Sequence, residues 1–361
     1  MEYQELADDL NRYREIYIYG AGVIAYGAYV ALRDLLGIKV SAFLVTDRGN
    51  QLEQIDGIPV KTFGESQIAS SYFIVIATPE EYHENIEQLL LQNGNLNYLK
   101  LDSHIEYVLM GRYFKEICNA NLIEDYETFD FDHMASVGIY MAVSHMDRKL
   151  KTIYREVPWI KKIQVGAVLT KKRITELTDE NCNAFSEKNA LYGELSATYY
   201  AWKNGIYDVT GIFHYRRVLS VTREQLGLLV NKEIEVILPL PFVCYPDASG
   251  QYGRYLSETD VKVMLDVLKE KELDHFERFR ELLKKSYLYN YNMLIARKEV
   301  FDDYCGWIFP LLEEITDRCE RKKCNRSPRY IGRIGEILTS LYFMRNERKW
   351  KIVHAEKIWR V

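Results

Sequence analysis

The stretch EIYIYGAGVIAYGAYVAL, close to the amino terminus, constrains the fold more than any other part of the chain. Its apolar segment from Ile16 to Tyr19 predicts a buried strand, and a glycine turn then leads into a helix. Further strands are predicted by IKVSAFLV, by the segment from Phe73 to Ala77 and by LNYLKLD. Strands that alternate with helices favour a parallel sheet covered on both faces. We therefore expect residues 1–104 to form a small doubly wound α/β domain.

The glycine turn has the spacing of a nucleotide-binding loop. Gly20 permits the tight turn, Gly22 lets backbone approach a phosphate, and Ala25 allows close packing of helix on strand. The second strand ends just before Asp47, where an acidic side chain binds a ribose hydroxyl in dinucleotide-binding folds. The domain resembles the Rossmann-like modules attached to bacterial sugar-modifying enzymes, such as sugar acyltransferases. A packing or oligomerising role without a ligand is the equal alternative.

A second α/β pattern follows a polar, tyrosine-rich segment. Residues 105–135 are expected to form a helical connector, and residues 136–361 a larger domain. The segment from Ile139 to Val143 predicts a buried strand, and a glycine ends the next one. Open α/β sheets bind ligands at the carboxyl ends of their strands. This position nominates four residues for donor binding: Ala142, Ser144, His145 and Gly166.

The stretch SEKNALYGELSATYYAWKNG predicts one helix that begins near Asn189 or Leu191 and ends at Gly205. Polar groups of both signs crowd its amino end, where the helix dipole favours an anion. We expect these residues to contribute to the donor site as well: Ser186, Lys188, Asn189 and Glu194.

The stretch GIFHYRRVLS is a buried strand that ends in His214, Tyr215, Arg216 and Arg217. A guanidinium group can donate two parallel hydrogen bonds to phosphate oxygens, so both arginines are candidates for an anionic ligand. The alternative is a buried network in which they pair with Glu187 or Glu194. His214 is a candidate base, a candidate hydrogen-bond donor, or a histidine satisfied within the core.

Polar residues of the carboxyl-terminal half suggest the other side of the site. A proline- and tyrosine-rich loop holds Asp247, Tyr252 and Arg254, and such a loop can order on binding. Asn290 and Asn292 precede a strand, where carboxamides can bind sugar hydroxyls. We expect Tyr252, Arg254, Asn290 and Asn292 to bind the acceptor, with Asp247 a candidate catalytic carboxylate.

The ordered series YMAVSHMD, IQVGA, SEKNALYGELSATYYAWKN, YDVTGIFHYRRVL, YNYNMLIARKEVF and RYIGRIGEILTSLYF resembles the domain-of-unknown-function 4422 family over residues 137–345. That family is found in bacterial capsular and exopolysaccharide loci and is regarded as glycosyltransferases. The resemblance implies an A-type glycosyltransferase-like fold, a nucleotide-sugar donor that is expected to be UDP-linked, and a surface-polysaccharide or lipid-linked glycan acceptor. It also favours Glu336 as the acceptor-side base or as an anchor of the hydrogen-bond network, with Asp247 and Glu194 as rivals.

One departure from that architecture concerns metal ions. A-type enzymes usually place an Asp-x-Asp motif at the strand end that holds His214 to Arg217 here. Fixed cations and a bound metal can both stabilise a leaving diphosphate. We therefore expect no required cofactor, with Mn²⁺ or Mg²⁺ as the open alternative.

Composition narrows the remaining possibilities. A net charge of −5 argues against a nucleic-acid binder, and the polar start without a long apolar run predicts a cytoplasmic protein. Trp350 and Trp359 near the end are expected to pack on the domain, with peripheral contact at the inner membrane face as the alternative. Homo-oligomerisation stays open. The competing functions are a non-catalytic nucleotide-binding or assembly protein and an NAD-dependent oxidoreductase.

Overall fold

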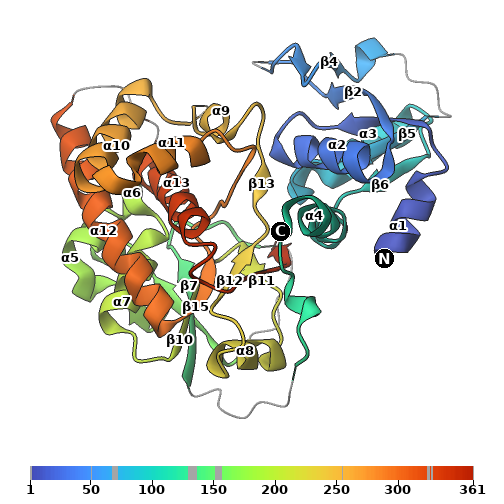
Figure 1. Ribbon diagram of the computed structural model, residues 1–361. Helices are drawn as coiled ribbons and strands as arrows, with labels where there is room; N and C mark the ends of the chain where they lie inside the picture. Colours follow the sequence, from blue (N-terminus) through green and yellow to red (C-terminus); the bar gives the residue numbers. More distant parts are fainter. Residues whose placement is uncertain are drawn as a thin grey trace.

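The computed structural model describes residues 2–49, 51–66, 72–128, 136–150, 157–253, 255–322, 326 and 328–360. Arg254, expected to bind the acceptor, lies outside these ranges. The chain forms two α/β domains that lie side by side, with the amino-terminal domain the smaller (Figure 1). No helix among the described residues is long and apolar enough to cross a lipid bilayer.

The amino-terminal domain contains the doubly wound sheet that the sequence predicts. Its strand order is β3-β4-β2-β1-β5-β6, and all neighbours from β4 to β6 are parallel. The short antiparallel pair β3–β4 was not expected. The strands are β1 (Glu15–Tyr19), β2 (Lys39–Val45), β3 (Gln54–Ile55), β4 (Ile58–Thr62), β5 (Phe73–Ile76) and β6 (Tyr98–Lys100).

Four helices cover this sheet: α1 (Tyr3–Leu10), α2 (Val23–Leu36), α3 (His83–Gln92) and α4 (Ser103–Cys118). The last of these occupies part of the segment expected to be a connector. Its buried side chains Leu109 and Phe114 belong to the core of the amino-terminal domain. The packed unit therefore extends through α4, because that helix covers apolar surface of α2.

The larger domain is built on a mixed sheet in the order β16-β12-β15-β10-β7-β8-β9. Strands β10, β7, β8 and β9 are parallel, whereas β15 runs antiparallel to both of its neighbours. Beyond the end of β10, β11 pairs with β17 as an antiparallel ribbon. The strands are β7 (Val137–Val143), β8 (Ile160–Gln164), β9 (Leu177–Thr178), β10 (Val209–His214), β11 (Arg217–Leu219), β12 (Val236–Pro239), β15 (Leu294–Arg297), β16 (Ile352–Ala355) and β17 (Lys357–Trp359).

The helix expected from Asn189 to Gly205 is two helices. Gly193 separates them with φ 59° and ψ −128°, a conformation that is open essentially only to glycine. A Cβ at this position would also press on the guanidinium of Arg329. The helices of this domain are α5 (Asn183–Glu187), α6 (Asn189–Tyr192), α7 (Leu195–Asn204), α8 (Arg223–Val230), α9 (Ala248–Tyr252), α10 (Glu258–Lys271), α11 (Phe276–Leu282), α12 (Lys298–Arg321) and α13 (Tyr330–Arg345).

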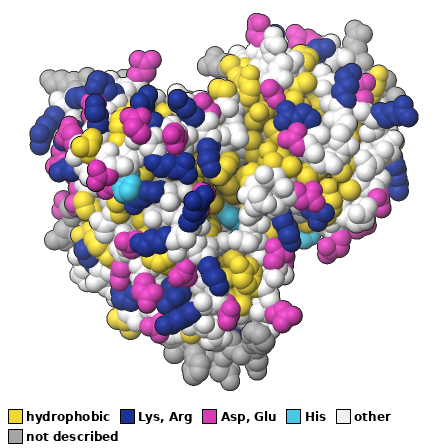
Figure 2. Space-filling view, viewed as in Figure 1, with side chains coloured by type: hydrophobic (Ala, Val, Ile, Leu, Met, Phe, Trp, Pro, Cys, Tyr) yellow, Lys and Arg dark blue, Asp and Glu magenta, His cyan; other side chains and the backbone are white. Residues whose placement is uncertain are grey.

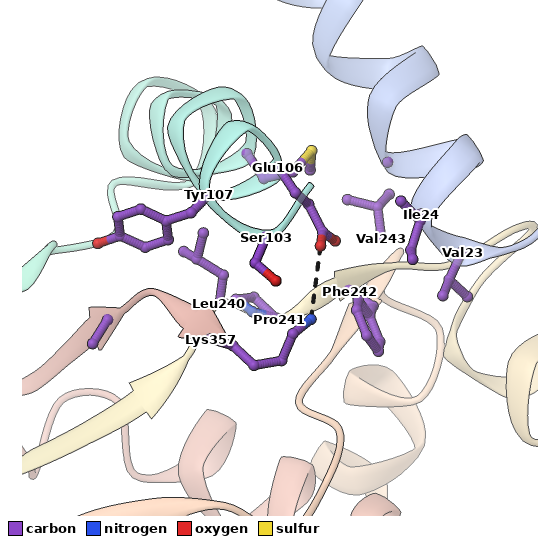
Figure 3. Close-up of a pocket in the computed structure, with 13 residues that line it drawn as sticks. Val23, Ile24, Ser103, Glu106, Tyr107, Leu240, Pro241, Phe242, Val243 and Lys357 are labelled. Carbon is purple, nitrogen blue, oxygen red and sulfur yellow. Dashed lines mark ion pairs between the residues drawn. The ribbon is translucent and has the colours of Figure 1, made fainter. Parts of the chain in front are cut away.

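The two domains meet where α2 lies against β13 (Phe242–Val243) and α4 lies against β17. Val23 of α2 packs into the core that contains Phe242. Figure 3 shows an ion pair at this interface, with Lys357 Nζ 3.7 Å from Glu106 Oε2. Both side chains are largely buried, at 9% and 14% exposed, so this pair ties the carboxyl-terminal strand to the amino-terminal domain.

Lys357→Met is expected to lower the free energy of unfolding by roughly 3 kcal/mol, because it leaves the Glu106 carboxylate buried without its partner. Methionine fills much of the volume of the lysine side chain, so the main change is the loss of the positive charge that pairs with Glu106. The matched control is Lys349→Met, whose exposed pair with Asp303 is expected to contribute less than about 1 kcal/mol. Urea denaturation measures both, and equal losses would contradict a special role for the interface pair.

Candidate functional site

Two cavities lie on either side of the residues that end β10. The first, of about 340 Å³, lies at the carboxyl ends of β7, β8 and β10 and is called here the strand-end cavity. The second, of about 350 Å³, lies between α13, the β13 region and the amino-terminal domain and is called here the interdomain cavity. Five residues line both cavities and form a shared wall: Glu194, His214, Arg216, Arg217 and Arg329.

Eight of the residues expected to bind a donor line the strand-end cavity. Three of them belong to the shared wall, and the other five are Ala142, Ser144, His145, Gly166 and Asn189. The turn after β7 is fixed by Asp147, whose carboxylate accepts a hydrogen bond of 2.7 Å from the Ser144 amide. Burial raises the pKa of Asp147 to about 6. The turn after β8 is fixed by the buried Asp179, which accepts from the amides of Gly166 and Ala167.

Arg217 is held by aromatic rings. Its guanidinium carbon lies 4.3 Å from the ring centre of Tyr291 and 4.1 Å from that of Trp359. Burial lowers the pKa of Arg217, but a guanidinium stays charged at neutral pH. Within the described ranges no carboxylate pairs with Arg217 or Arg216, and the Nε of Arg217 has no hydrogen-bond partner. The rings therefore fix the cation without neutralising it.

Glu194 is engaged by a different arginine from the two expected. It forms an ion pair with Arg329 and accepts a hydrogen bond of 2.9 Å from Asn292 Nδ2. Burial alone would raise the pKa of Glu194, but electrostatic attraction to His214 and Arg329 and the hydrogen bond from Asn292 hold it below the ordinary value. The alternative in which Arg216 or Arg217 pairs with Glu187 or Glu194 is not found among the described residues.

His214 lies in the shared wall and is 8% exposed. Burial, together with the nearby charges of Arg217 and Arg329, lowers the pKa of His214 to about 4, so the ring is neutral at pH 7. Its Nε2 is 3.9 Å from Glu194 Oε1, which is too far for a hydrogen bond. This nitrogen has no partner in the described part of the chain, and it is available to a ligand that bridges the two cavities.

Glu336 lines the interdomain cavity from the second turn of α13. Its Oε1 accepts a hydrogen bond of 3.2 Å from the amide of Tyr291. Burial, and then the charge of Glu194, raise the pKa of Glu336 to about 7. A carboxylate with this pKa can accept a proton near neutral pH.

The backbone at Tyr291 and Asn292 is strained, with φ values of 81° and 50°. This conformation aims the Tyr291 amide at Glu336 and turns Asn292 inward. Asn292 lines neither cavity; its side chain bonds to Glu194, to the carbonyl of Gly332 and to Thr339. Asn292 is therefore a positioning residue.

Several expected site residues are used elsewhere in the fold. Ser186 is buried and donates to Asp179 at 2.6 Å, and Lys188 pairs with Glu320 at 3.1 Å. Asp247 accepts from Ser249 Oγ and from the amide of Gly250, so it caps the short helix α9. None of these three lines either cavity, whereas Tyr252 and Asn290 both line the interdomain cavity.

Three site residues were not expected from the sequence: Tyr291, Arg329 and Trp359. Arg333 was expected to face the cleft together with Glu336, and both line the interdomain cavity. The basic run RSPRYIGR precedes Glu336 and is the signal that points to Arg329 and Arg333. Tyr291 lies between two residues that were expected. For Trp359 there was no local signal, because strand pairing brings it to Arg217 from far along the chain.

The amino-terminal glycine turn has a packing explanation. A Cβ on Gly20 would overlap the carbonyl oxygen of Ala77, so the approach of two strand ends already requires glycine there. Gly22 is the N-cap of α2 and Ala25 is buried in that helix, while Asp47 is exposed and accepts from the Gly49 amide. These four residues line neither cavity. Their nucleotide-binding role stays a prediction.

The shared wall does not fit a divalent cation. Such ions prefer several oxygen ligands. Instead, β10 ends at His214, and Tyr215, Arg216 and Arg217 follow it. The one carboxylate of the wall, Glu194, is already engaged by Arg329 and Asn292. No group of three or more His, Cys, Asp or Glu side chains in the described part of the chain is arranged to hold a metal.

Part of the chain has a fold similar to that of a solved glycosyltransferase. The apo structure of the WbbM bifunctional glycosyltransferase superposes with a TM-score of 0.53 and 22% identity, over 62% of this chain and 45% of that one. The chain thus spans less than half of that relative's length. The family model described as a domain of unknown function, DUF4422, matches residues 139–347, more than half of the chain. The chain belongs to the DUF4422 family. No curated protein matches it.

Glu336→Gln is expected to become more stable than the parent as the pH rises. In the native protein the pKa of Glu336 is raised from 4.5 to about 7, so its contribution to stability is full below 4.5 and is lost as the pH rises through 7. Glutamine removes that pH dependence. Urea denaturation at pH 5 and pH 8 measures the change, and a difference between variant and parent that is the same at both pH values would contradict the raised pKa.

Proposed function

We propose that the protein is a glycosyltransferase that moves a sugar from a nucleoside-diphosphate donor, expected to be UDP-linked, to a hydroxyl group of a surface-polysaccharide or lipid-linked glycan. The observation that carries this proposal is the uncompensated guanidinium of Arg217 in the wall between two cavities. Membership of the DUF4422 family and the glycosyltransferase-like fold support it.

The donor is assigned to the strand-end cavity. The nucleoside would lie against the strand ends from Ala142 to His145, and the diphosphate would reach the shared wall. There Arg216 and Arg217 supply fixed positive charge where the leaving group develops negative charge. Because Arg217 is already oriented by Tyr291 and Trp359, little reorganisation accompanies the reaction.

The acceptor is assigned to the interdomain cavity, on the other side of that wall. Its hydroxyl oxygen forms a bond to the anomeric carbon while the bond from that carbon to the β-phosphate oxygen breaks. The electron pair leaves with the nucleoside diphosphate, and the hydroxyl proton passes to the Glu336 carboxylate. The neutral His214 can form a hydrogen bond with either substrate, since its Nε2 has no partner among the described residues.

Arg217→Lys and Arg217→Gln test the proposed function. Lysine keeps the charge and loses the planar fork, so we expect it to retain part of the activity. Glutamine is expected to reduce turnover on the order of 10²-fold or more, as loss of an oriented transition-state donor does. The measurement is release of nucleoside diphosphate from a panel of nucleotide sugars. Normal turnover in both variants, or no turnover and no UDP binding by the parent protein, would contradict the proposal.

Turnover is also expected to survive chelation, because arginines occupy the place of oxygen ligands. The same release assay with and without EDTA measures this. The contrary result would be complete loss of turnover with EDTA and its recovery with added Mn²⁺.

A further inference from the structure

The interdomain cavity contains one arginine, Arg333, that does not line the cavity assigned to the donor. Arg333, on α13 and one turn before Glu336, lines this cavity and not the strand-end cavity. Its guanidinium carbon lies 4.0 Å from the ring centre of Tyr255. No carboxylate within the described ranges forms an ion pair with it, and its Nε is buried without a hydrogen-bond partner. Arg333 thus contacts one aromatic face, that of the exposed Tyr255, whereas Arg217 contacts two rings.

The charges around the cavity leave a positive excess on this side. Arg329 is neutralised by Glu194, and Arg216 and Arg217 are shared with the strand-end cavity, where the diphosphate is assigned. Glu336, with its pKa at about 7, carries only part of a negative charge at neutral pH. A neutral sugar would leave Arg333 desolvated and unpaired, and this is costly unless the ligand itself carries an anion.

The amino-terminal domain closes the opposite side of the same cavity. Val23 and Ile24, the first two residues of α2, line it together with Pro79, which follows β5. In Figure 3 the labelled Val23 and Ile24 project from α2 toward the Phe242 region of the larger domain. Figure 2 shows a hollow between the domains where Lys and Arg side chains lie near hydrophobic ones. The positive end of the α2 dipole has the same sign as Arg333.

We propose that the interdomain cavity binds an anionic glycan acceptor, whose carboxylate or phosphate pairs with Arg333 while a sugar face packs on Val23, Ile24 and Pro79. The inference rests on the proposed function, because it specifies the substrate of the same site. It also gives the amino-terminal domain a role in recognising the acceptor. Doubly wound domains bind ligands at the carboxyl ends of their strands. In this proposal that edge of the amino-terminal sheet faces the acceptor bound by the larger domain.

The first experiment compares three probes on the full chain by ligand-observed NMR titration: methyl β-glucuronide, glucose 1-phosphate and uncharged methyl β-glucoside. We expect at least one charged probe to bind about 10-fold more tightly than the glucoside, as one ion pair of about 1.4 kcal/mol provides. The stronger of the two charged probes distinguishes a sugar carboxylate from a phosphate. Arg333→Gln is expected to abolish the preference, and Arg333→Lys to keep part of it.

The second experiment tests the wall from the amino-terminal domain. Ile24→Asp places a negative charge in the cavity and is expected to weaken binding of the charged probes. Ile24→Asn introduces a side chain of the same shape as aspartate but without charge, and it is expected to keep the preference for charged probes. Equal binding of charged and uncharged probes by the parent protein, no effect of Arg333→Gln, or equal effects of the two Ile24 variants would overturn the proposal. All titrations are made with and without UDP. If the parent protein prefers charged probes but does not bind UDP, the proposed glycosyltransferase function is contradicted. If it binds UDP but shows no preference for charged probes, only the inference about the acceptor is contradicted.

Discussion

Pairing of β17 with β11 is the interaction on which both the site and the domain interface depend. The register sets Trp359 opposite Arg217, so the carboxyl-terminal strand delivers one of the two rings that hold the guanidinium. Two residues earlier on the same strand, Lys357 reaches Glu106 of α4. The Trp359 amide also donates to Ser103 Oγ at the start of that helix. A single short strand therefore positions the cation of the site and fastens the amino-terminal domain beside it.

The positive charge of the shared wall persists because Arg217 contacts aromatic rings and does not pair with a carboxylate. A carboxylate beside Arg217 would orient it equally well but would cancel the charge that an anionic ligand needs. Aromatic faces orient the guanidinium and leave that charge uncompensated, at the cost of partial desolvation. The same low-dielectric surroundings keep His214 neutral and raise the pKa of Glu336. Buried cations, a neutral imidazole and a carboxylate poised near pH 7 are mutually consistent with a site prepared for an anion and a proton transfer.

Much of the fold could be predicted from the sequence, because its signals are local. Short apolar segments placed the strands β1, β2, β5 and β7 in the right order, and the two arginines after β10 lie in the wall between the two cavities. The break at Gly193 was not predicted, and the contact that leaves no room for a side chain there comes from Arg329, which is distant in sequence. For the same reason Trp359 was not placed in the site. Asp247 illustrates the opposite error: a polar loop residue resembles a catalytic one, whereas its carboxylate caps the first turn of α9.

The amino-terminal glycine turn shows how one motif serves two different ends. Gly20 is required where the ends of β1 and β5 approach each other, whether or not a nucleotide binds. The glycine in this turn is therefore explained by backbone geometry and is not by itself evidence of a nucleotide. That geometry also directs the start of α2 toward the carboxyl ends of its own strands, where a ligand is ordinarily expected. In this chain that direction leads to the cavity of the second domain, as Val23 and Ile24 show. A domain with this turn can thus contribute a wall to another site, whether or not it binds a ligand of its own.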